Sequence, residues 1–564
     1  MSGRDILLGT RTFRKLREGN YVYVDKTGFI SEFLSGAGAK VSIITRPRRF
    51  GKSLLLNMLM EFFDIRKDSR ELFEGLAVSK DKDICSKWMN KYPVIYLSLN
   101  EIKTESFEES YGYFETVASK LCGQYEFLLS SPKVGKFHKI ALEAVLSCTA
   151  KNVEPCMFIN TLCEAIYQDC GIKPVILIDE YDAPLSKIKG EEDYKKMASF
   201  LDYFYEISLK SNDYFEFSIL TGCLRFTNAD ITTGFNNYVS YGVNDLSFAD
   251  KFGFTHEEVQ SLLAEQGFSD KMDTLQEWYD GYCFGNSHPI YCPWDVMNYL
   301  YDLKESQNAR PKKYWINTSG NDVVLRLLEG VTGCTADTIT TLLNHAGIDA
   351  EIKENLTYKN LYDSKQNVWT LLYFTGYLTK VPNTEDETGT VLGLRIPNKE
   401  IYDFFMLTAE SVFRRRVDGN DSLPLFFDAF WNRADQTVSE MLSALFTKAI
   451  SFHDYGGVFC HAVLAGLFKR EYPHTTSDYG NGAGMADIIV RDRANKRAAV
   501  IEIKRHSDTE TPLSSSVDRA LRHIADMKYD ALLQGDYSVI LHWGIACQDK
   551  SCVAKSVDGK REAV

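Results

Sequence analysis

Four short apolar runs, separated by stretches with helical spacing, mark the first 250 residues. They are VSIIT at 41–45, VIYLSL at 94–99, VILI at 175–178 and FSIL at 217–220. Continuous apolar runs of this length are typical of strands buried on both faces of a parallel sheet. Between them, LLLNMLMEFFD and YKKMASFLDYFYEISLK repeat apolar residues with the period of a helix. The alternation predicts an α/β domain with a doubly wound sheet over residues 1–250.

The pattern becomes mostly helical over residues 251–450. It opens with FTHEEVQSLLAEQG, where Thr255 and Glu258 have the spacing of a capping box. Further on, VWTLLYFTGYLTKV, the polar NTEDETG and VLGLRIPNKEIYDFF predict helix, strand, loop, strand and helix. This order fits a winged-helix-like unit, and it fits a structural lid with an incidental hairpin equally well.

The last part, residues 451–564, changes again. A helix is expected near 457–470, then strands in GNGAGMADIIVRD and KRAAVIEIKRH, then a helix from about 517. Because single cores stop growing near roughly 250 to 300 residues, a chain of 564 residues is expected to hold several domains. We place three of them, at 1–250, 251–450 and 451–564.

Composition fits a folded protein without a membrane segment. Hydrophobic residues make up 45% of the chain and charged residues 25%, which is typical of globular domains. No apolar run approaches the roughly 20 residues that span a bilayer. The opening MSGRDILLGT lacks the basic and apolar zones of a secretion signal. We therefore expect a cytoplasmic protein with no membrane partner.

The charge is distributed unevenly. The net charge is −13, yet residues 451–564 hold 15 Lys and Arg against 15 Asp and Glu, so the acidic excess lies before them. Nonspecific binding to nucleic acid needs clustered cations, so any contact with DNA or RNA is expected to be local.

The 13 cysteines include no CxxC pair, which argues against a zinc ribbon or a redox centre. Cys156, Cys163 and Cys170 recur every seven residues in a helical pattern. We expect them to pack in the core rather than to bind a metal or form a disulfide.

A phosphate-binding loop follows the first apolar run. Gly51, Lys52 and Ser53 meet the end of the formula GxxxxGK[ST], whereas Arg46 stands at its first glycine. In such loops the backbone N–H groups cradle the phosphates, the lysine neutralises them and the hydroxyl binds Mg²⁺. Because a strand precedes the loop and an apolar helix follows it, we predict an ATP site at Arg46, Pro47, Arg48, Arg49, Phe50, Gly51, Lys52, Ser53 and Leu54. Arg48 and Arg49 are expected to add charge near the phosphates or to face solvent.

Two acidic residues end the third apolar run, in VILIDEYDAP. Asp179 at the end of a strand can hold Mg²⁺ through water, together with Ser53, and Glu180 can act as the general base that activates water. The sequence thus predicts ATP hydrolysis, with Glu180 and Lys52 as catalytic residues. The alternative is a strand that ends in a solvated acidic turn.

The strand at 94–99 lies between these two motifs in sequence, as in P-loop ATPases that insert a strand there. Thr221 ends the fourth run and can sense the γ-phosphate. Arg225 lies four residues beyond it. We expect Arg225 to act as a sensor or an arginine finger, at its own site or at that of a neighbour in a homo-oligomer, or else to form a surface salt bridge.

With these residues in view, the sequence resembles a bacterial family of predicted AAA-ATPase-like proteins with a C-terminal domain of the PD-(D/E)XK nuclease superfamily. The resemblance spans nearly the whole chain through YVDKTGFI, RPRRFGKSLLLNML, LIDEYDAP, ILTGCLRF, WYDGYCFG, YWINTSGN, LYFTGYLT and IPNKEIYDFF. An arginine at the place of Arg46 is usual in that family. For Asp25 and Lys26 in YVDKTGFI we favour a structural loop over a place in the nucleotide pocket.

The resemblance also implies a small α/β restriction-endonuclease-like domain at 451–564. In PD-(D/E)XK enzymes two carboxylates hold Mg²⁺ or Mn²⁺, and a lysine on the same strand positions or deprotonates water. Asp487, Glu502 and Lys504 match these catalytic positions, with Asp487 and Glu502 as the metal ligands. Residues i and i+2 of a strand share a face, which explains the spacing of the last two.

Two positions depart from the pattern of that superfamily. Gly457 stands where related domains tend to have a glutamate, and His523, six residues before Tyr529, stands where a glutamine is typical. His461 can substitute in the site, although a structural histidine is the more ordinary interpretation.

Two functions compete on this reading. In the first, ATP turnover drives or gates cleavage of nucleic acid by the C-terminal domain. In the second, the protein is a nucleotide-controlled switch or scaffold whose C-terminal domain binds nucleic acid or a partner without cutting.

Overall fold

The computed structural model describes residues 3–559 except 150–153, 226–234, 317–335, 344–345, 354–355, 357–363, 385–389, 418–422, 450–456, 478–485, 506–510, 530–532, 534 and 549–550. The chain divides into two compact units. Unit 1 comprises Met1–Ser319 with Asp349–Lys399, and unit 2 comprises Gly320–Ile348 with Glu400–Val564. The domain limits near residues 250 and 450 stay predictions.

The main sheet of unit 1 is built from the predicted apolar runs. Its strands are β1 (Val41–Thr45), β2 (Val94–Ser98), β3 (Val175–Asp179), β4 (Ser218–Gly222) and the short β5 (Val239–Tyr241), which was not predicted. All pairings are parallel, in the order β2-β3-β4-β1-β5. Every residue of β1, β3 and β4 is buried, which explains why these strands are continuously apolar. The predicted α/β sheet is confirmed.

The strand order brings the two sequence motifs together. β4 lies between β1 and β3, and its Thr221 pairs in register with Asp179. Parallel strands end at the same edge, so the loop after β1 and the acidic residues after β3 meet there. The strand at 94–99, which lies between the motifs in sequence, forms the outer edge of the sheet instead.

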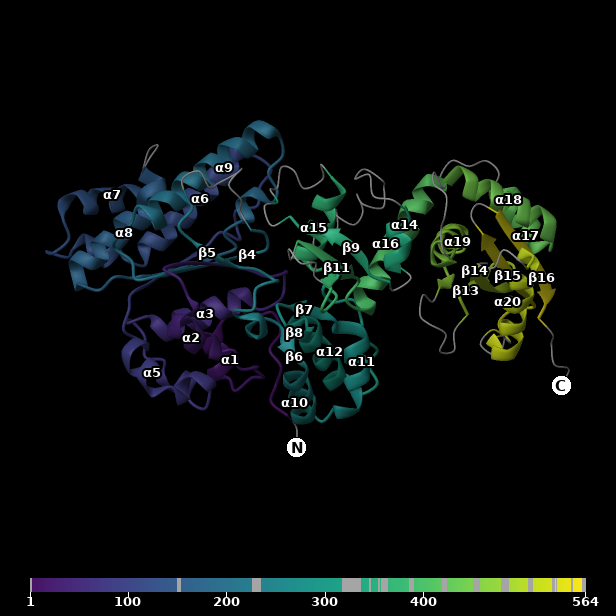
Figure 1. Cartoon of the computed structure of the whole chain (residues 1–564), viewed down its shortest axis with the longest axis horizontal. Helices are drawn as coiled ribbons and strands as arrows, with labels where there is room; N and C mark the ends of the chain where they lie inside the picture. The colour runs from purple at the N-terminus through teal and green to yellow at the C-terminus, as the bar shows by residue number, and fades with distance from the viewer. Residues whose placement is uncertain are drawn as a thin grey trace. The chain divides into compact units, whose positions relative to one another are not determined.

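Helices cover both faces of this sheet (Figure 1). On one side lie α1 (Phe13–Glu18), α2 (Gly28–Glu32), α3 (Lys52–Phe63) and α5 (Lys82–Trp88), the last preceded by the short α4 (Arg70–Phe73). On the other lie α6 (Phe107–Gly123), α7 (Lys136–Leu146), α8 (Glu154–Cys170) and α9 (Glu191–Tyr205).

The core on the α6–α9 side is aromatic and includes two of the three cysteines of α8. Phe114 packs edge-on against Phe204 with 5.1 Å between the ring centroids. Cys156 and Cys163 are buried, as predicted, whereas Cys170 at the end of α8 is exposed.

Residues 254–316 and 349–399 add further helices and two three-stranded sheets to unit 1. The helices are α10 (His256–Gln266), α11 (Met272–Tyr279), α12 (Pro293–Glu305) and α15 (Lys365–Thr375). One sheet holds β6 (Phe254–Thr255), β8 (Ser287–Tyr291) and β7 (Tyr282–Phe284), and the other holds β10 (Thr379–Lys380), β11 (Val391–Arg395) and β9 (Ile348–Glu351).

Two local predictions for this region are confirmed. The capping box of α10 is present, since Thr255 Oγ1 accepts from the Glu258 amide and the Glu258 carboxylate accepts from the Thr255 amide. The order α15, β10, β11 and α16 (Lys399–Val417) is the predicted helix, strand, strand and helix. Most of the polar NTEDETG loop between the strands lies outside the described residues.

The WYDGYCFG, LYFTGYLT and IPNK segments meet in unit 1 although they are far apart in sequence. A Cβ on Gly281 would lie 2.0 Å from the Pro397 carbonyl oxygen, so only glycine fits there. The Tyr282 hydroxyl donates to the Gly376 carbonyl at 3.2 Å, and the Tyr282 ring packs edge-on against Phe50 of the phosphate loop. These segments therefore brace the outer side of that loop.

Unit 2 contains a five-stranded mixed sheet. Its strands, in spatial order, are β12 (Thr476–Ser477), β13 (Ile488–Asp492), β14 (Arg497–Arg505), β15 (Val539–Gln548) and β16 (Ser551–Asp558). Only β14 and β15 pair in parallel. β13 and β14 were predicted, whereas β15 and β16 were not.

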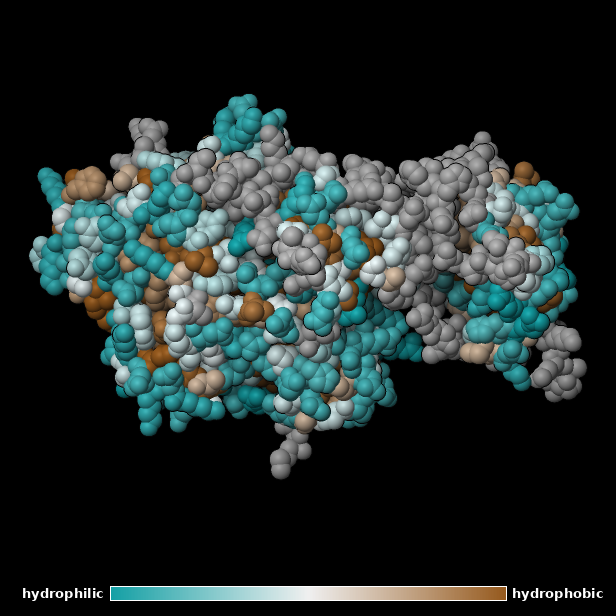
Figure 2. All heavy atoms as spheres, in the orientation of Figure 1, coloured by the Kyte–Doolittle hydropathy of each residue, from teal (hydrophilic) through white to brown (hydrophobic). Residues whose placement is uncertain are grey.

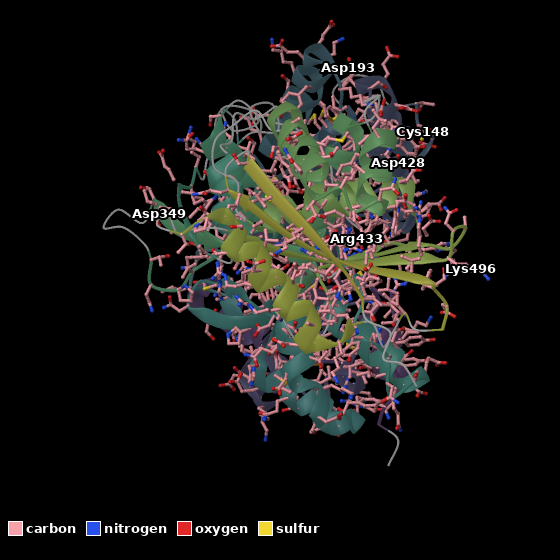
Figure 3. The ribbon with its side chains drawn as sticks, turned by 90° about the vertical axis from the view of Figure 1, so that its right-hand side faces the viewer. Cys148, Asp193, Asp349, Asp428, Arg433 and Lys496 are labelled. Carbon is pink, nitrogen blue, oxygen red and sulfur yellow. The ribbon has the colours of Figure 1, made fainter. Side chains whose placement is uncertain are left out.

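The helices of unit 2 that contact this sheet are α17 (Leu423–Trp431), α18 (Asp435–Ala449), α19 (Gly457–Glu471) and α20 (Leu513–Met527). Unit 2 also holds α14 (Ala336–Leu343) and most of α16. Figure 3 looks onto the sheet with α20 across it, Lys496 at the β13–β14 turn and Arg433 near the strands. The Arg433 guanidinium forms an ion pair with Asp558 at 2.6 Å, which ties the α17–α18 turn to the last strand.

The described surface is mainly hydrophilic in the view of Figure 2, with apolar groups gathered over the α7–α8 region. Phe137 and Ile140 of α7 are 69% and 57% exposed. Within the described ranges, no helix has both the length and the apolar character needed to cross a bilayer.

Candidate functional site

A cavity of about 360 Å³ opens in unit 1 at the edge where the strands of the main sheet end. Its wall includes the phosphate loop from Arg48 to Leu55, together with Lys103 and Glu180. The parts of the wall that sequence reasoning missed include the segment Leu7–Arg11, Lys103 and Trp294 of α12. The volume is in the range of small-molecule sites, about 300 to 1,000 Å³.

The phosphate loop enters α3 through a left-handed glycine. Gly51 has φ 90° and is the N-cap of α3, which begins at Lys52. The first turn of a helix presents N–H groups that lack partners within the helix, and these groups favour an anion. The Lys52 ammonium donates to the carbonyls of Arg46 at 2.9 Å and Pro47 at 2.8 Å, so the lysine lies folded over the loop.

Arg46 has a different place from the one predicted. Its side chain is fully buried and does not line the cavity. The guanidinium donates to the carbonyls of Thr45 at 2.8 Å, Tyr241 at 3.0 Å and Gly242 at 2.7 Å. Burial lowers its pKa to about 10. The assignment of this side chain to the nucleotide is therefore corrected, because it anchors the start of the loop to β5.

Replacing Arg46 by methionine should strongly destabilise unit 1. The substitution leaves the carbonyls of Thr45, Tyr241, Gly242 and Phe248 without this donor, at about 1 kcal/mol or more each, so the free energy of unfolding should fall by about 4 kcal/mol. Urea unfolding followed by tryptophan fluorescence measures this loss. Arg70→Ala is the control, since Arg70 is 79% exposed and its loss should change stability by less than about 0.5 kcal/mol. Equal stability of the two variants would contradict the anchoring role.

Asp179 ends β3 with one oxygen bonded and one unsatisfied. The Thr221 hydroxyl donates to Asp179 Oδ1 at 2.8 Å, so Thr221 orients this carboxylate rather than lining the cavity. Oδ2 is buried and accepts no hydrogen bond from any described residue. The Tyr96 phenol lies nearby, and burial together with the charge of Asp179 raises its pKa. A buried, unsatisfied carboxylate oxygen is the donor that a divalent cation would satisfy.

Glu180 occupies a strained position at the mouth of the cavity. Its φ of 52° lies in the left-handed region, which is costly for a residue with a side chain and is found at functional sites. Lys103 Nζ contacts its Oε2 at 2.6 Å. Burial raises the pKa of Glu180, but the hydrogen bond and charge of Lys103, together with the charges of Lys52 and Arg48, outweigh burial and hold this pKa below its ordinary value.

The other predicted arginines separate into two groups. Arg48 and Arg49 are exposed and line the cavity. The Arg49 guanidinium stacks over the Trp294 ring at 4.3 Å, and burial lowers its pKa. Arg225 does not line the cavity and donates to the Ser240 carbonyl of β5 at 3.4 Å.

The VYVDKTGFI segment makes structural contacts and also contributes Tyr23, Val24 and Lys26 to the cavity wall, so neither interpretation from the sequence excludes the other. The Asp25 carboxylate accepts from the amides of Thr27 at 2.8 Å and Ala77 at 2.6 Å. Lys26 touches the cavity wall, but its ammonium is bonded to the Glu258 carboxylate at 2.7 Å. This pair ties the segment to the first turn of α10.

The second candidate site lies on β13 and β14 of unit 2. Asp487 directly precedes β13, and its Oδ2 accepts from the Ile503 amide at 2.7 Å. Glu502 is buried, and Lys504 Nζ donates to its Oε1 at 2.8 Å. The structure thus brings together the three residues that the sequence predicted. The GNGAGM segment before them lies mainly outside the described residues.

One histidine contacts the Glu502 carboxylate, and a second contacts the backbone of Asp487. His523 Nδ1 of α20 lies 2.8 Å from Glu502 Oε1, although without the alignment of a hydrogen bond. His461 of α19 is buried, which lowers its pKa to about 4, while a hydrogen bond to the Asp487 backbone acts in the opposite direction. Gly457 begins α19 and supplies no carboxylate.

The carboxylate of Glu502 in unit 2 has one oxygen that could bind a divalent metal. Glu502 Oε2 is buried and has no hydrogen-bond partner among the described residues, as at Asp179. Nowhere in the described parts of the chain do three or more His, Cys, Asp or Glu side chains form a cluster that could hold a metal ion. Protein ligands for a metal at this site would therefore be the pair Asp487 and Glu502.

The fold and the first site define a class, the α/β P-loop nucleotide-binding proteins, here joined to a restriction-endonuclease-like sheet. Residues 7–232 match the family model described as predicted AAA-ATPase. Residues 458–557 match the model of the PD-(D/E)XK nuclease superfamily. The chain thus carries an AAA-ATPase-like domain and, at its C-terminal end, a PD-(D/E)XK nuclease-superfamily domain.

One bacterial protein is similar to this chain in amino-acid sequence. The "Uncharacterized protein in vnfD 5'region" of Azotobacter chroococcum mcd 1 is 29% identical over 330 residues, which cover 58% of this chain and 57% of the relative. The chain therefore spans little more than half the length of this relative.

Proposed function

We propose that the protein is a Mg²⁺-dependent ATPase whose turnover controls a metal-dependent, nuclease-like C-terminal domain acting on DNA or RNA. The observation that carries the first half is that the phosphate loop and Glu180 line one cavity at the edge of the sheet, where the buried Asp179 ends β3 next to Glu180. Lys52 and the first turn of α3 would bind the phosphates, and Ser53 and Asp179 would hold Mg²⁺, which neutralises charge on the phosphate oxygens when bound.

The proposed reaction is the hydrolysis of the γ-phosphate of ATP by water. Glu180 accepts a proton from the water that attacks the γ-phosphorus, and the bond from that phosphorus to the β-phosphate oxygen breaks. The products are ADP, inorganic phosphate and a proton that leaves Glu180 for solvent. The hydrogen bond and charge of Lys103 favour the ionised form of Glu180, which is the form that accepts this proton.

The competing function is a nucleotide-controlled switch or scaffold that binds nucleic acid or a partner without cleavage. Gly457 at the start of α19 favours it, because a pair of carboxylates is a sparse metal site. The contact of His523 with Glu502 Oε1 also favours the non-cleaving function, because this histidine occupies a carboxylate oxygen that a metal would use.

Lys52→Ala tests the nucleotide site. Loss of a charge-assisted hydrogen bond of about 1.5 to 3 kcal/mol should weaken ATP binding about 10- to 100-fold. Titration calorimetry of the full chain with ATP and Mg²⁺ measures the change. Lys87→Ala, an exposed change on α5 away from the cavity, serves as the control. Equal affinity of Lys52→Ala and the unmodified protein would refute the assignment.

A further inference from the structure

Arg11 is a cation in the nucleotide cavity that sequence reasoning did not identify. It lies in the extended segment before α1, lines the cavity and is exposed. Its guanidinium forms no hydrogen bond and no ion pair with any residue that the structure describes. An arginine carries five N–H donors in a planar fork suited to phosphate oxygens.

Most of the other cations around the cavity already have protein partners. The lining residues include seven Lys and Arg side chains against the single carboxylate of Glu180. Four ammonium groups are bonded to protein oxygens: Lys26 to Glu258, Lys52 to loop carbonyls, Lys103 to Glu180 and Lys251 to Asp250. Such an excess of positive charge in a concave site favours a polyanion, and Arg11 has its donors available for one.

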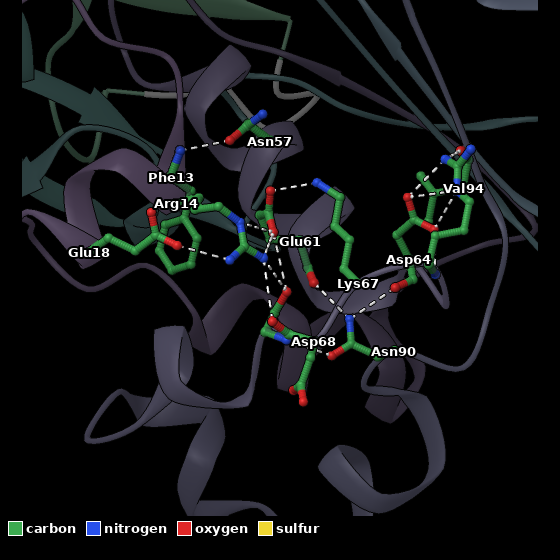
Figure 4. A network of polar contacts seen from close by, with 12 residues as sticks. Phe13, Arg14, Glu18, Asn57, Glu61, Asp64, Lys67, Asp68, Asn90 and Val94 are labelled. Carbon is green, nitrogen blue, oxygen red and sulfur yellow. Dashed lines mark hydrogen bonds and ion pairs between the residues drawn. The ribbon is translucent and has the colours of Figure 1, made fainter. Parts of the chain in front are cut away.

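Phe13 and Arg14, which closely follow Arg11 in the chain, are fixed to the helix that follows the phosphate loop (Figure 4). Two residues after Arg11, the Phe13 amide donates to Asn57 Oδ1 of α3 at 2.6 Å. Arg14 then forms an ion pair with Glu61 of α3 at 2.8 Å. The Phe13 ring is fully buried. The segment that carries Arg11 is therefore positioned by the same helix whose first turn would bind phosphate.

The charge of Arg11 acts on both halves of the site. Burial lowers the pKa of Arg49, and the nearby positive charge of Arg11 lowers it further. Burial and the charge of Asp179 raise the pKa of Tyr96 on β2, and the positive charge of Arg11 opposes this rise. Arg11 thus lies within electrostatic range of the phosphate loop and of the acidic end of β3.

We propose that Arg11 binds the terminal phosphate of the nucleotide and so distinguishes a nucleoside triphosphate from a diphosphate. This inference rests on the proposed nucleotide site. The loop backbone serves the phosphates that both nucleotides share and Lys52 reaches the β- and γ-phosphates, whereas a cation carried by the N-terminal segment adds a further contact for the third phosphate alone. Arg225, the candidate that the sequence offered for this task, is bonded to β5 and lies outside the cavity wall.

Binding measurements on the full chain test the proposal without relying on turnover. Titration calorimetry with Mg²⁺ compares ADP with a slowly hydrolysed ATP analogue in the unmodified protein, Arg11→Ala and Arg11→Lys. Arg11→Ala should weaken binding of the analogue about 10- to 100-fold, because a charge-assisted contact is lost. ADP affinity should change less than about twofold. Arg11→Lys should restore part of the loss, since it keeps the charge without the fork.

Lys15→Ala is the matched control, because Lys15 is an exposed cation four residues away that does not line the cavity. It should leave both affinities unchanged. An equal loss for ADP and the analogue in Arg11→Ala, or no loss for either, would overturn the role of Arg11 while the nucleotide site stands. Absence of any nucleotide binding by the unmodified protein would overturn the proposed function itself.

Discussion

Replacing Glu180 by glutamine is expected to reduce ATP turnover about 100- to 1,000-fold while nucleotide affinity stays nearly constant. A positioned general base contributes about 10² to 10⁴ to rate, and glutamine keeps the shape of the side chain without its basicity. The strained φ of 52° holds Glu180 at the cavity mouth rather than in the sheet. Phosphate release measured under saturating ATP, together with calorimetric binding, separates the two quantities.

Glu192→Gln makes the same chemical change at an 83% exposed position of α9 and should leave turnover unchanged. Turnover by Glu180→Gln at the unmodified rate would rule out Glu180 as the base and leave a scaffold that binds nucleotide as the better account.

The pH dependence of ATP turnover is a second test of Glu180 as the general base. Burial raises the pKa of Glu180, whereas Lys103, with smaller contributions from the charges of Lys52 and Arg48, lowers it, and the lowering prevails. The base form therefore persists below the ordinary carboxylate range, and turnover should fall only when the pH drops through this lowered pKa. Lys103→Gln removes the lowering influence, so the acidic limb of the profile should move to higher pH. A limb that does not move would show that another group titrates.

Replacing Lys504 by alanine is expected to reduce metal-dependent cleavage of nucleic acid about 100-fold or more. Lys504 bonds Glu502 at 2.8 Å and shares its strand face, so it can position the attacking water beside a metal held by Asp487 and Glu502. Incubation of the purified protein with plasmid or single-stranded DNA and Mg²⁺ or Mn²⁺, followed by gel electrophoresis, measures the effect.

Lys555→Ala is the control, because the 54% exposed Lys555 forms a surface pair with Asp518 that contributes little. Cleavage that persists in Lys504→Ala would remove the nuclease assignment. DNA retention without cleavage by the unmodified protein would instead favour the non-cutting switch. A parallel reaction with Lys52→Ala shows whether cleavage depends on the ATP site.

The sequence alone predicted the elements whose signals are local. The buried strands were readable because strands covered on both faces are continuously apolar. Gly51, Lys52 and Ser53 were readable because a phosphate loop is a contiguous piece of backbone between a strand and a helix. The pair Glu502 and Lys504 followed from the two-residue period of a strand. β15 and β16 were missed even though they complete the sheet around that pair.

The tertiary structure decided which side chains serve the cavity and which serve the fold. Arg46 belongs to the loop in sequence, but its donors go to carbonyls nearly 200 residues away on β5, so it anchors rather than binds. Lys103 reaches Glu180 only because β2 and β3 are neighbours. Arg11 reaches the cavity because Asn57 and Glu61 hold the following helix against α3. Sequence patterns predict local backbone structure and which face of a helix or strand is buried. These contacts, in contrast, form only when distant segments fold together.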